Sequence, residues 1–294
     1  MMQTKTGKVF LIINNYAGHH EGAKAVEIVL PLLLKNNFEA EYAFTQYAGH
    51  ATELASKASE AGYDLVVAVG GDGTINEVAQ GLIGTQTPMG IIPVGSGNGL
   101  ARELGISMNM KKSADKLING VDLQIDVCKL NNQRYLCTSG IGFDAQIADQ
   151  MSKASSRGLL RYVQLVIMES IKYKSINVKM KIDGKLINQS VFLITFANAS
   201  QFGNNAFIAP GASMTDGLMD VVVVKPFSKL WLPIFAMALF TKHINKLPFV
   251  ECFKASQVEL EWADTSIFHF DGEPGQLTIP AKLTIDSAKI FVRC

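Results

Sequence analysis

The sequence predicts an α/β domain followed by a β-rich domain. Three observations support this order. Apolar runs of strand length alternate with helical spacing in the first half. Two of those runs end in glycine-rich loops that lead into helices. The second half changes to short runs with turn signals, Asn131-Asn132 and Asp183-Gly184, which predict antiparallel hairpins. We therefore expect domains at 1–127 and 128–283.

Composition describes a globular protein with an ample core, since 48% of the 294 residues are hydrophobic and 18% are charged. The 27 basic and 26 acidic residues give no bulk attraction to nucleic acid. Four cysteines lie far apart without a C-x-x-C pair, so neither a zinc site nor a disulfide framework is indicated. The amino-terminal residues lead into a strand without a signal-peptide apolar region, and a cytoplasmic location is expected.

The first half reads as strict alternation of strand and helix, which predicts a parallel sheet wrapped by helices. Pro31 is expected to kink the first helix, and Gly62 to close the second. The predicted strands are 8–14, 39–44, 64–69 and 89–93, and the predicted helices are 21–36, 50–61, 74–83, 98–104 and 111–119.

The first glycine loop, GGDGT, follows the Val-rich strand and opens a helix with Thr74 at a capping position and Glu77 three residues later. Backbone N–H groups at such a turn are free to hold an anion, usually phosphate. Asp72 would repel phosphate, unless a magnesium ion or water lies between them or a hydroxyl is being ordered or deprotonated. The alternative is a plain turn in which Asp72 only caps the helix.

A second glycine loop, VGSGNG, follows the strand that ends at Pro93. Loops at the carboxyl ends of neighbouring parallel strands face one crevice, where ligands of open α/β sheets bind. The two loops together predict a nucleotide site.

The motifs GGDGTINEV and IIPVGSGNGLAREL resemble the diacylglycerol kinase catalytic domain family, which includes bacterial lipid kinases and sphingosine kinases. The resemblance extends over nearly the whole chain. NAD kinases and phosphofructokinases share a GGDGT-like loop, and the second loop favours the lipid kinases. Many bacterial members read GTxND there; Gly99 replaces the aspartate, a form closer to the sphingosine kinase branch.

The resemblance implies a first domain like that of NAD kinases and phosphofructokinases, and a second that is a β-sandwich with inserted helices at about 144–153 and 158–173. The last strand, at about 284–294, would return to the first domain. The other predicted strands are 122–130, 133–139, 175–182, 185–197, 256–262, 267–271, 276–279 and 282–292.

The predicted ATP site combines the two glycine loops with a turn after the first strand and a threonine after the second. The turn resembles a family Asn-Pro-x-Ser-Gly loop with its proline and serine replaced. The predicted nucleotide-binding residues are Asn14, Asn15, Gly18, Thr45, Gly70, Gly71, Gly73, Thr74, Asn76, Glu77, Gly95, Ser96, Gly97 and Asn98.

Acidic residues of the second half supply further candidates. Asp122 and Asp126 are four apart on one predicted strand face, and Asp126 resembles an aspartate that the family uses near the lipid hydroxyl. The alternative is a charge at a strand edge.

Related bacterial lipid kinases hold a structural magnesium through positions that correspond to Ser213, Asp216 and the carbonyl of Leu218. Here the alternative is a simple Asp-Gly turn.

The run Phe268–Pro274 ends a strand in Asp-Gly-Glu, which predicts two carboxylates projecting from a turn. The resemblance makes Glu273 the general base, acting with Asp72 and Asp126. Packing beside Phe268 and Phe270 is expected to desolvate its carboxylate. A solvated hairpin turn is the alternative.

The apolar segment Leu230–Phe240 is too short to cross a bilayer, which needs about 20 residues. It could lie in the membrane interface, line an acyl-chain pocket or form a buried core helix. Lysines flank it at 225, 229, 242 and 246.

These features predict an ATP- and magnesium-dependent lipid kinase that transfers the γ-phosphoryl group to the hydroxyl of a diacylglycerol-like or sphingoid-like membrane lipid. Peripheral membrane association is expected, nucleic-acid binding is not, and a homodimer is left open. The alternatives are an NAD kinase-like enzyme with a soluble substrate and a non-catalytic lipid- or nucleotide-sensing module.

Overall fold

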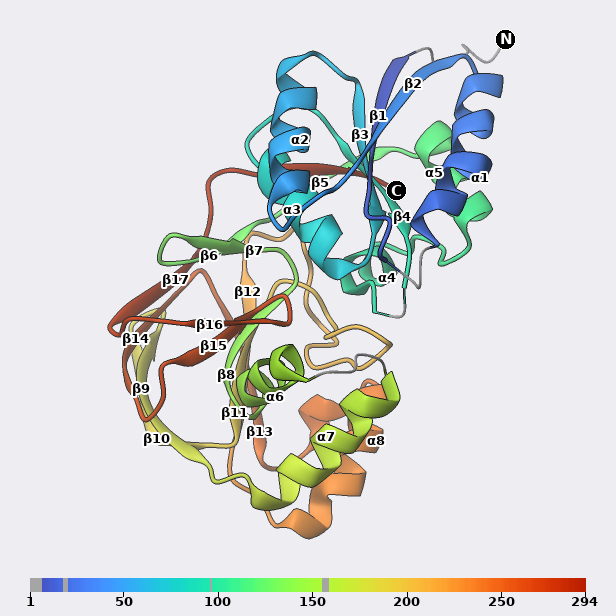
Figure 1. Ribbon diagram of the computed structural model, residues 1–294. Helices are drawn as coiled ribbons and strands as arrows, with labels where there is room; N and C mark the ends of the chain where they lie inside the picture. The colour runs from blue at the N-terminus through green and yellow to red at the C-terminus, as the bar shows by residue number, and fades with distance from the viewer. Residues whose placement is uncertain (1–6, 18–20, 96, 155–158) are drawn as a thin grey trace. The chain divides into compact units, whose positions relative to one another are not determined.

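The protein is described by a computed structural model over residues 7–17, 21–95, 97–154 and 159–294. Its contacts divide the chain into two compact units (Figure 1). The first unit comprises Met1–Ile125 and Ser287–Cys294, and the second comprises Asp126–Asp286.

The first unit is built on a six-stranded sheet with the order β2-β1-β3-β4-β18-β5. Every neighbouring pair is parallel except β18 with β5, which is antiparallel. The central strand β3 is buried along its whole length, as expected for a Val-rich strand covered on both faces. The strands are β1 Gly7–Ile13, β2 Phe38–Phe44, β3 Leu65–Gly70, β4 Met89–Pro93, β5 Asp122–Ile125 and β18 Ile290–Arg293.

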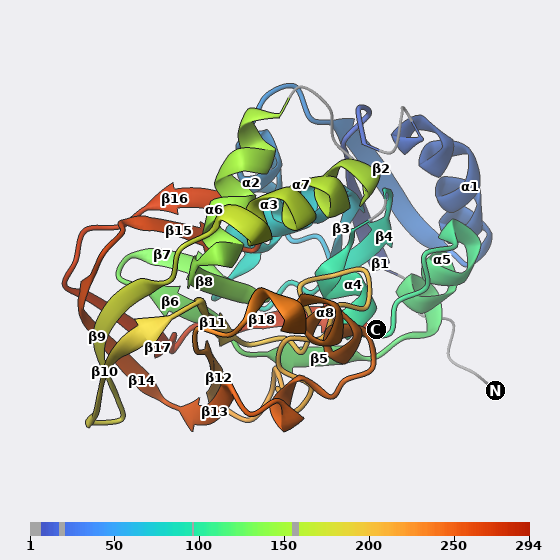
Figure 2. The same ribbon diagram turned by 90° about the horizontal axis from the view of Figure 1, so that it is seen from below.

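Helices cover both faces of this sheet, with α1 and α5 on one side and α2 and α3 on the other (Figures 1 and 2). In α1, Ala25, Val29 and Leu33 recur every four residues and are fully buried, so one stripe of the helix faces the core. Pro31 lies inside this helix, which continues past it to Lys35. The helices are α1 Gly22–Lys35, α2 His50–Glu60, α3 Asp72–Leu82, α4 Gly99–Glu103 and α5 Met110–Asn119.

The second unit contains two six-stranded sheets whose strands pair antiparallel, with the orders β10-β9-β14-β17-β6-β7 and β13-β12-β11-β8-β15-β16. The first sheet consists of β6 Cys128–Leu130, β7 Gln133–Tyr135, β9 Ile176–Ile182, β10 Lys185–Val191, β14 Gln257–Ala263 and β17 Ala281–Ile285. The second consists of β8 Thr138–Gly142, β11 Leu193–Ala197, β12 Met219–Val224, β13 Val250–Ala255, β15 Ile267–Phe270 and β16 Glu273–Gln276.

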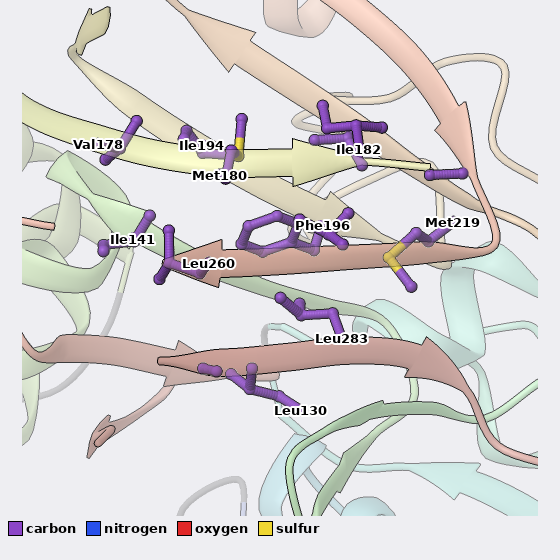
Figure 3. Close-up of a cluster of buried hydrophobic side chains, with 14 of the residues drawn as sticks. Leu130, Ile141, Val178, Met180, Ile182, Ile194, Phe196, Met219, Leu260 and Leu283 are labelled. Carbon is purple, nitrogen blue, oxygen red and sulfur yellow. The ribbon is translucent and has the colours of Figure 1, made fainter. Parts of the chain in front are cut away.

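Apolar side chains from both sheets form one buried cluster (Figure 3). Met180 and Leu260 come from the first sheet, and Ile141 and Phe196 from the second. The unit is therefore a β-sandwich. Together with the parallel sheet of the first unit, it confirms the predicted fold class.

Helices cover the other side of the second sheet through a second buried cluster. Phe143 and Ile147 of α6 and Phe235 of α8 pack there with Val222 and Val224 of β12. The helical segments are α6 Phe143–Lys153, α7 Leu159–Lys172, η1 Lys229–Trp231, α8 Leu232–Phe240 and η2 Ile244–Lys246. Across the described residues, no helix is both long and apolar enough to span a bilayer.

Five predicted strands are wrong in extent. The predicted strand 133–139 comprises β7 and the beginning of β8, which belong to different sheets, and the predicted strand 276–279 overlaps β16 only at Gln276. The predicted strand 185–197 is two strands of different sheets, because the chain crosses between the sheets at Phe192, whose N–H donates to Val224 O at 2.7 Å. The predicted strands 122–130 and 282–292 are each divided between the two units in the same way.

Candidate functional site

A cavity of about 340 Å³ in the first unit lies where β1, β2 and β3 end. Its lining includes residues that follow each of these strands, as expected for the carboxyl edge of a parallel sheet. Five predicted nucleotide-binding residues meet there, with others that the sequence reading missed. The lining residues are Asn14, Tyr16, Thr45, Gln46, Tyr47, Ala48, Ala51, Gly73, Thr74 and Glu77.

Thr74 is fixed against the end of the first strand. Its hydroxyl accepts a hydrogen bond from Asn14 Nδ2 at 3.1 Å. A Cβ at Gly70 would come within 2.6 Å of the Thr74 side chain, so glycine is what permits this approach. The predicted capping role of Thr74 is wrong, because α3 begins earlier, at Asp72, with Gly71 as its N-cap.

Glu77 is the acidic residue in the cavity lining. Its Oε2 accepts the backbone N–H of Ala51 at 3.2 Å, and its carbonyl accepts from Thr52 Oγ1 at 2.8 Å. These bonds join α3 to the start of α2. Among the lining residues that the structure describes, one is a carboxylate and none is a lysine or arginine.

Asp72 connects the two glycine loops. Its Oδ2 accepts the N–H of Asn98 at 2.8 Å, and its Oδ1 accepts the N–H of Gly99 at 2.6 Å. A Cβ at Gly97 would collide with the same carboxylate. Both oxygens are therefore engaged by the second loop at the start of α4, whereas we expected them to order a metal ion, a water or a hydroxyl. The catalytic role of Asp72 stays a prediction.

The second loop has further internal hydrogen bonds. Asn98 is fully buried and donates through Nδ2 to Gly95 O at 3.2 Å. Arg102 Nε donates to Gly97 O at 2.8 Å. Gly95 lines another cavity, of about 450 Å³, in company with Lys24 and Lys111.

The other predicted nucleotide-binding residues are placed as follows. Asn76 Oδ1 accepts from Gln80 Nε2 at 3.1 Å along α3. Asn15 Oδ1 is buried and has no hydrogen-bond partner among the described residues. Gly18 and Ser96 lie outside the described residues.

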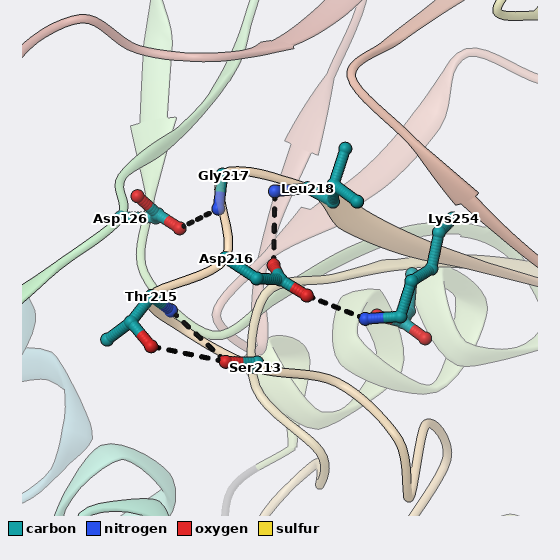
Figure 4. A network of polar contacts seen from close by, with 8 residues as sticks. Asp126, Ser213, Thr215, Asp216, Gly217, Leu218 and Lys254 are labelled. Carbon is teal, nitrogen blue, oxygen red and sulfur yellow. Dashed lines mark hydrogen bonds and ion pairs between the residues drawn. The ribbon is translucent and has the colours of Figure 1, made fainter.

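In the second unit, the predicted lipid-side aspartate lies against the predicted metal loop (Figure 4). Asp126 is 4% exposed, and its Oδ2 accepts the N–H of Gly217 at 2.7 Å. Its own N–H donates to Met214 O at 2.6 Å. Asp122 is not its neighbour on one strand face, because β5 ends at Ile125; Asp122 instead accepts two hydrogen bonds from Arg293 in the first unit.

The residues of the predicted magnesium loop do not fit a divalent cation. Asp216 Oδ1 accepts the N–H of Leu218 at 3.1 Å, and Oδ2 accepts from Lys254 Nζ at 2.7 Å (Figure 4). The same ammonium lies 3.4 Å from Asp220 Oδ2. The hydrogen bond to Asp216 raises the pKa of Lys254. A lysine thus supplies the positive charge beside this carboxylate.

The rest of the loop supplies few ligands for a metal. Ser213 Oγ accepts the N–H of Thr215 at 3.4 Å and lies 3.3 Å from its hydroxyl oxygen (Figure 4). Over the described parts of the chain, no three His, Cys, Asp or Glu side chains are grouped to hold a metal ion. Among the predicted ligands Ser213, Asp216 and Leu218, the one carboxylate is paired with Lys254, and the ligand set stays a prediction.

The Asp-Gly-Glu turn presents one carboxylate to solvent, where we expected two. Asp271 turns inward and accepts the N–H groups of three successive residues, 136–138, at 2.8, 2.7 and 3.0 Å. Glu273 is exposed. The expected desolvation of Glu273 is wrong, because Phe268 and Phe270 are buried in the sandwich core.

The apolar segment Leu230–Phe240 is buried on one side and exposed on the other. Phe235 and Ala238 are buried in the cluster beneath the second sheet. Leu230 is 87% exposed, and Met237 and Phe240 are also exposed. One side of this helix is core, and the other is an uncovered apolar face.

Comparison with known proteins decides the family. The model of the diacylglycerol kinase catalytic domain matches residues 8–130, and that of the YegS C-terminal NAD kinase beta sandwich-like domain matches residues 138–292. A diacylglycerol kinase of Bacillus subtilis is 32% identical over 272 residues, which cover 90% of this chain and 89% of that protein. The chain belongs to the diacylglycerol kinase catalytic domain family. The resemblance read from the two glycine motifs is thereby confirmed.

Two other relatives of this diacylglycerol kinase family member extend the comparison. A diacylglycerol kinase of Mycobacterium tuberculosis is 28% identical, with 88% of this chain and 82% of that protein covered. A crystal structure of a diacylglycerol kinase from Bacillus anthracis has a TM-score of 0.75 at 23% identity, covering 98% of this chain and 96% of the other, and supports the fold. The family member is thus a lipid kinase, a phosphotransferase that uses a nucleotide.

Proposed function

We propose that this family member transfers the γ-phosphoryl group of ATP to the hydroxyl of a membrane lipid of the diacylglycerol or sphingoid type. The observation that carries the proposal is the cavity at the ends of β1, β2 and β3, where Gly73 and Thr74 of the glycine loop meet Asn14 and Thr45. Its volume, about 340 Å³, lies within the usual range for small-molecule sites.

The charge of the cavity supports a nucleotide that enters as its magnesium complex. The described lining residues offer hydroxyl, amide and backbone N–H groups, and among them are Glu77 and no basic side chain. A bare triphosphate would therefore lack a counter-charge, which a bound divalent cation supplies. In this proposal the residues at the start of α3 hold phosphate oxygens through their N–H groups.

Glu273 is the proposed general base on the lipid side. As the lipid oxygen attacks the γ-phosphorus and the bond to ADP breaks, the hydroxyl proton must leave, and a carboxylate can accept it. Glu273 is exposed at the beginning of β16 and is free to meet a substrate. Asp126 has both its carboxylate and its N–H bonded to the 214–217 loop, which suits a residue that orders this region.

Two exposed apolar faces of the second unit support docking on a bilayer. The η1–α8 face comprises Leu230, Ile234, Met237 and Phe240, and the α7 face comprises Val163, Ile167, Met168 and Ile171. Val163, Ile167 and Ile171 are four residues apart, and Ile234, Met237 and Phe240 are three apart, so each set lies mainly on one side of its helix. Such faces bind the membrane interface when basic residues accompany them.

Lys229 connects the two apolar faces. Its Nζ donates to Tyr173 O, just beyond α7, at 3.2 Å, and lies 5.2 Å from the centre of the Phe192 ring. Lys172 ends α7, and Lys242 follows α8. Positive charge next to exposed apolar side chains favours a bilayer with anionic headgroups.

Phosphoryl transfer from radiolabelled ATP tests the proposal. The acceptors are diacylglycerol, monoacylglycerol, ceramide and a sphingoid base in mixed micelles, with NAD as a soluble acceptor. We expect magnesium-dependent labelling of a lipid, and a reduction of roughly 10²-fold in kcat on Glu273→Gln with little change in KM. Labelling of NAD alone, or of no acceptor, would contradict the proposed function.

A further inference from the structure

A buried polar group in the second unit has no part in the function described so far. His269 of β15 is 3% exposed, and its Nε2 lies 3.2 Å from Asp144 Oδ2 at the start of α6. The same carboxylate oxygen accepts from Thr195 Oγ1 of β11 at 3.0 Å. Three elements therefore converge on one histidine–aspartate pair.

Gly140 of β8 provides the space for this pair. A Cβ at that position would collide with the Asp144 carboxylate and come within 2.8 Å of His269 Nε2. The strand passes close beneath both side chains only because residue 140 has none. The pair is thus integrated into the packing of the second sheet.

The other ring nitrogen of His269 faces the Asp-Gly-Glu turn. The backbone N–H of Gly272 donates to Nδ1 at 3.4 Å. A neutral imidazole that accepts at Nδ1 carries its proton on Nε2, where the partner is a carboxylate, Asp144. The ring therefore bridges Asp144 and the turn in a single tautomer.

The turn depends on its backbone contacts to set the direction of Glu273. Within the described residues, no hydrogen bond reaches the Glu273 side chain. Asp271 and Gly272 both have positive φ, 50° and 86°, a strained conformation for the aspartate. Asp271 is held by the N–H groups of residues 136–138, and Gly272 is held by His269.

We propose that His269 is a positioning residue for Glu273: Asp144 and Thr195 hold its ring, and the ring holds the Gly272 amide that immediately precedes the base. This inference rests on the proposed function, in which Glu273 accepts the proton of the lipid hydroxyl. It adds an anchor to the turn beside the one at Asp271 and the antiparallel pairing of Glu273 with Phe270.

Two substitutions of His269 separate its two hydrogen bonds. His269→Gln places an amide near Nε2 and keeps a donor for Asp144, but it removes the acceptor for Gly272. His269→Asn places a carbonyl near Nδ1, and so keeps the acceptor and loses the bond to Asp144. With dioctanoylglycerol in mixed micelles, we expect His269→Gln to lower kcat by about tenfold at unchanged KM, on the scale of a misplaced catalytic group. His269→Asn should lower it less.

A double-mutant cycle with Glu273→Gln distinguishes positioning from a general structural defect. If His269 acts through Glu273, adding His269→Gln to Glu273→Gln should cause no further loss of kcat. An equal loss in both backgrounds, or normal kcat in His269→Gln, would overturn the proposal. If His269→Gln does not fold, Thr195→Val removes only the hydroxyl that holds Asp144, and the same cycle should show the same non-additivity.

Amide exchange at Gly272 tests the anchor independently of catalysis. We expect exchange about fivefold faster in His269→Gln, the effect of one lost hydrogen bond, and unchanged exchange in His269→Asn. Equal exchange in the wild-type protein and His269→Gln would overturn the proposed anchor. Normal turnover of Glu273→Gln would instead refute the role of Glu273 in the proposed function, while the exchange result still reports on the anchor.

Discussion

Asp72 accepts the backbone N–H of Asn98, although one residue begins a helix after β3 and the other follows β4. With its second bond, to Gly99, the carboxylate makes two charge-assisted hydrogen bonds, the stronger class of such contacts. The negative charge also lies at the amino end of α4, where the peptide dipoles favour it. One side chain thus sets the position of both glycine loops.

Asp72→Asn should therefore disrupt both loops at once. Asparagine offers one acceptor for two N–H groups, and its own NH₂ would face a donor. We expect the rate of phosphoryl transfer to fall by well over about tenfold while the fold survives. Steady-state kinetics and a thermal scan check this. Asp122→Asn is the matched control, because it weakens the bonds to Arg293 in the same unit, away from the cavity. Near-normal turnover of Asp72→Asn would contradict the assignment.

Leu230→Ser combined with Met237→Ser should weaken binding to vesicles of phosphatidylcholine and phosphatidylglycerol by at least about tenfold. Both side chains are exposed, and burying one in the interface contributes on the order of 1 kcal/mol or more. Co-sedimentation measures the binding, and the thermal transition should not move. As a control, Leu186→Ser with Trp262→Ser removes two other exposed apolar side chains, from the first sheet of the sandwich. Equal loss in both pairs would count against the η1–α8 face.

Lys254→Met should leave Asp216 and Asp220 without their shared counter-charge. We expect the free energy of unfolding to fall by roughly 1 kcal/mol, since the ammonium is partly exposed. Millimolar magnesium should then raise the thermal transition of this variant but not that of the wild-type protein or Lys254→Arg. Magnesium stabilisation of the wild-type protein that Asp216→Asn abolishes would instead show a cation bound beside the lysine.

Gly140→Ala should destabilise the second unit by about 1–3 kcal/mol, the usual cost of overpacking, because the added methyl meets Asp144 and His269. Urea unfolding measures the change. Gly211→Ala provides the comparison, since no atom lies within 4 Å of the added Cβ. Similar stability of the two variants would mean that Asp144 and His269 can shift without lowering the free energy of unfolding.

Periodicity was sufficient to predict the fold class and most elements of the first unit. The predicted strand 89–93 has the bounds of β4, because its short apolar run ends at the glycine loop. Periodicity failed for strands whose formation depends on tertiary contacts with neighbouring strands. Strands β12 and β13 were missed, although Val221–Val224 is a continuous apolar run buried within the second sheet. Such a run has no alternation to mark it.

The sequence was sufficient to predict which residues lie near the candidate site, but not the directions in which their side chains point. Glycine loops after strands indicate which residues gather at the sheet edge. They do not indicate that Asp72 turns toward an amide 26 residues away, or that Lys254 reaches Asp216 over 38 residues. Asp271 and Glu273 are two residues apart in one motif, yet only the first turns inward. Side-chain direction at a turn depends on tertiary contacts that no local pattern encodes.

The position of β18 between β4 and β5 affects the order in which the two units can fold during synthesis. On the ribosome, residues 1–125 emerge first, but their sheet lacks its fifth member until Ile290–Arg293 have been synthesised. The second unit is continuous in sequence and can close earlier, which reverses the usual amino-to-carboxyl order of folding during synthesis. Until β18 is synthesised and pairs there, an open edge at β4 is available to other nascent strands, so the demand for chaperones should be greatest in the first unit.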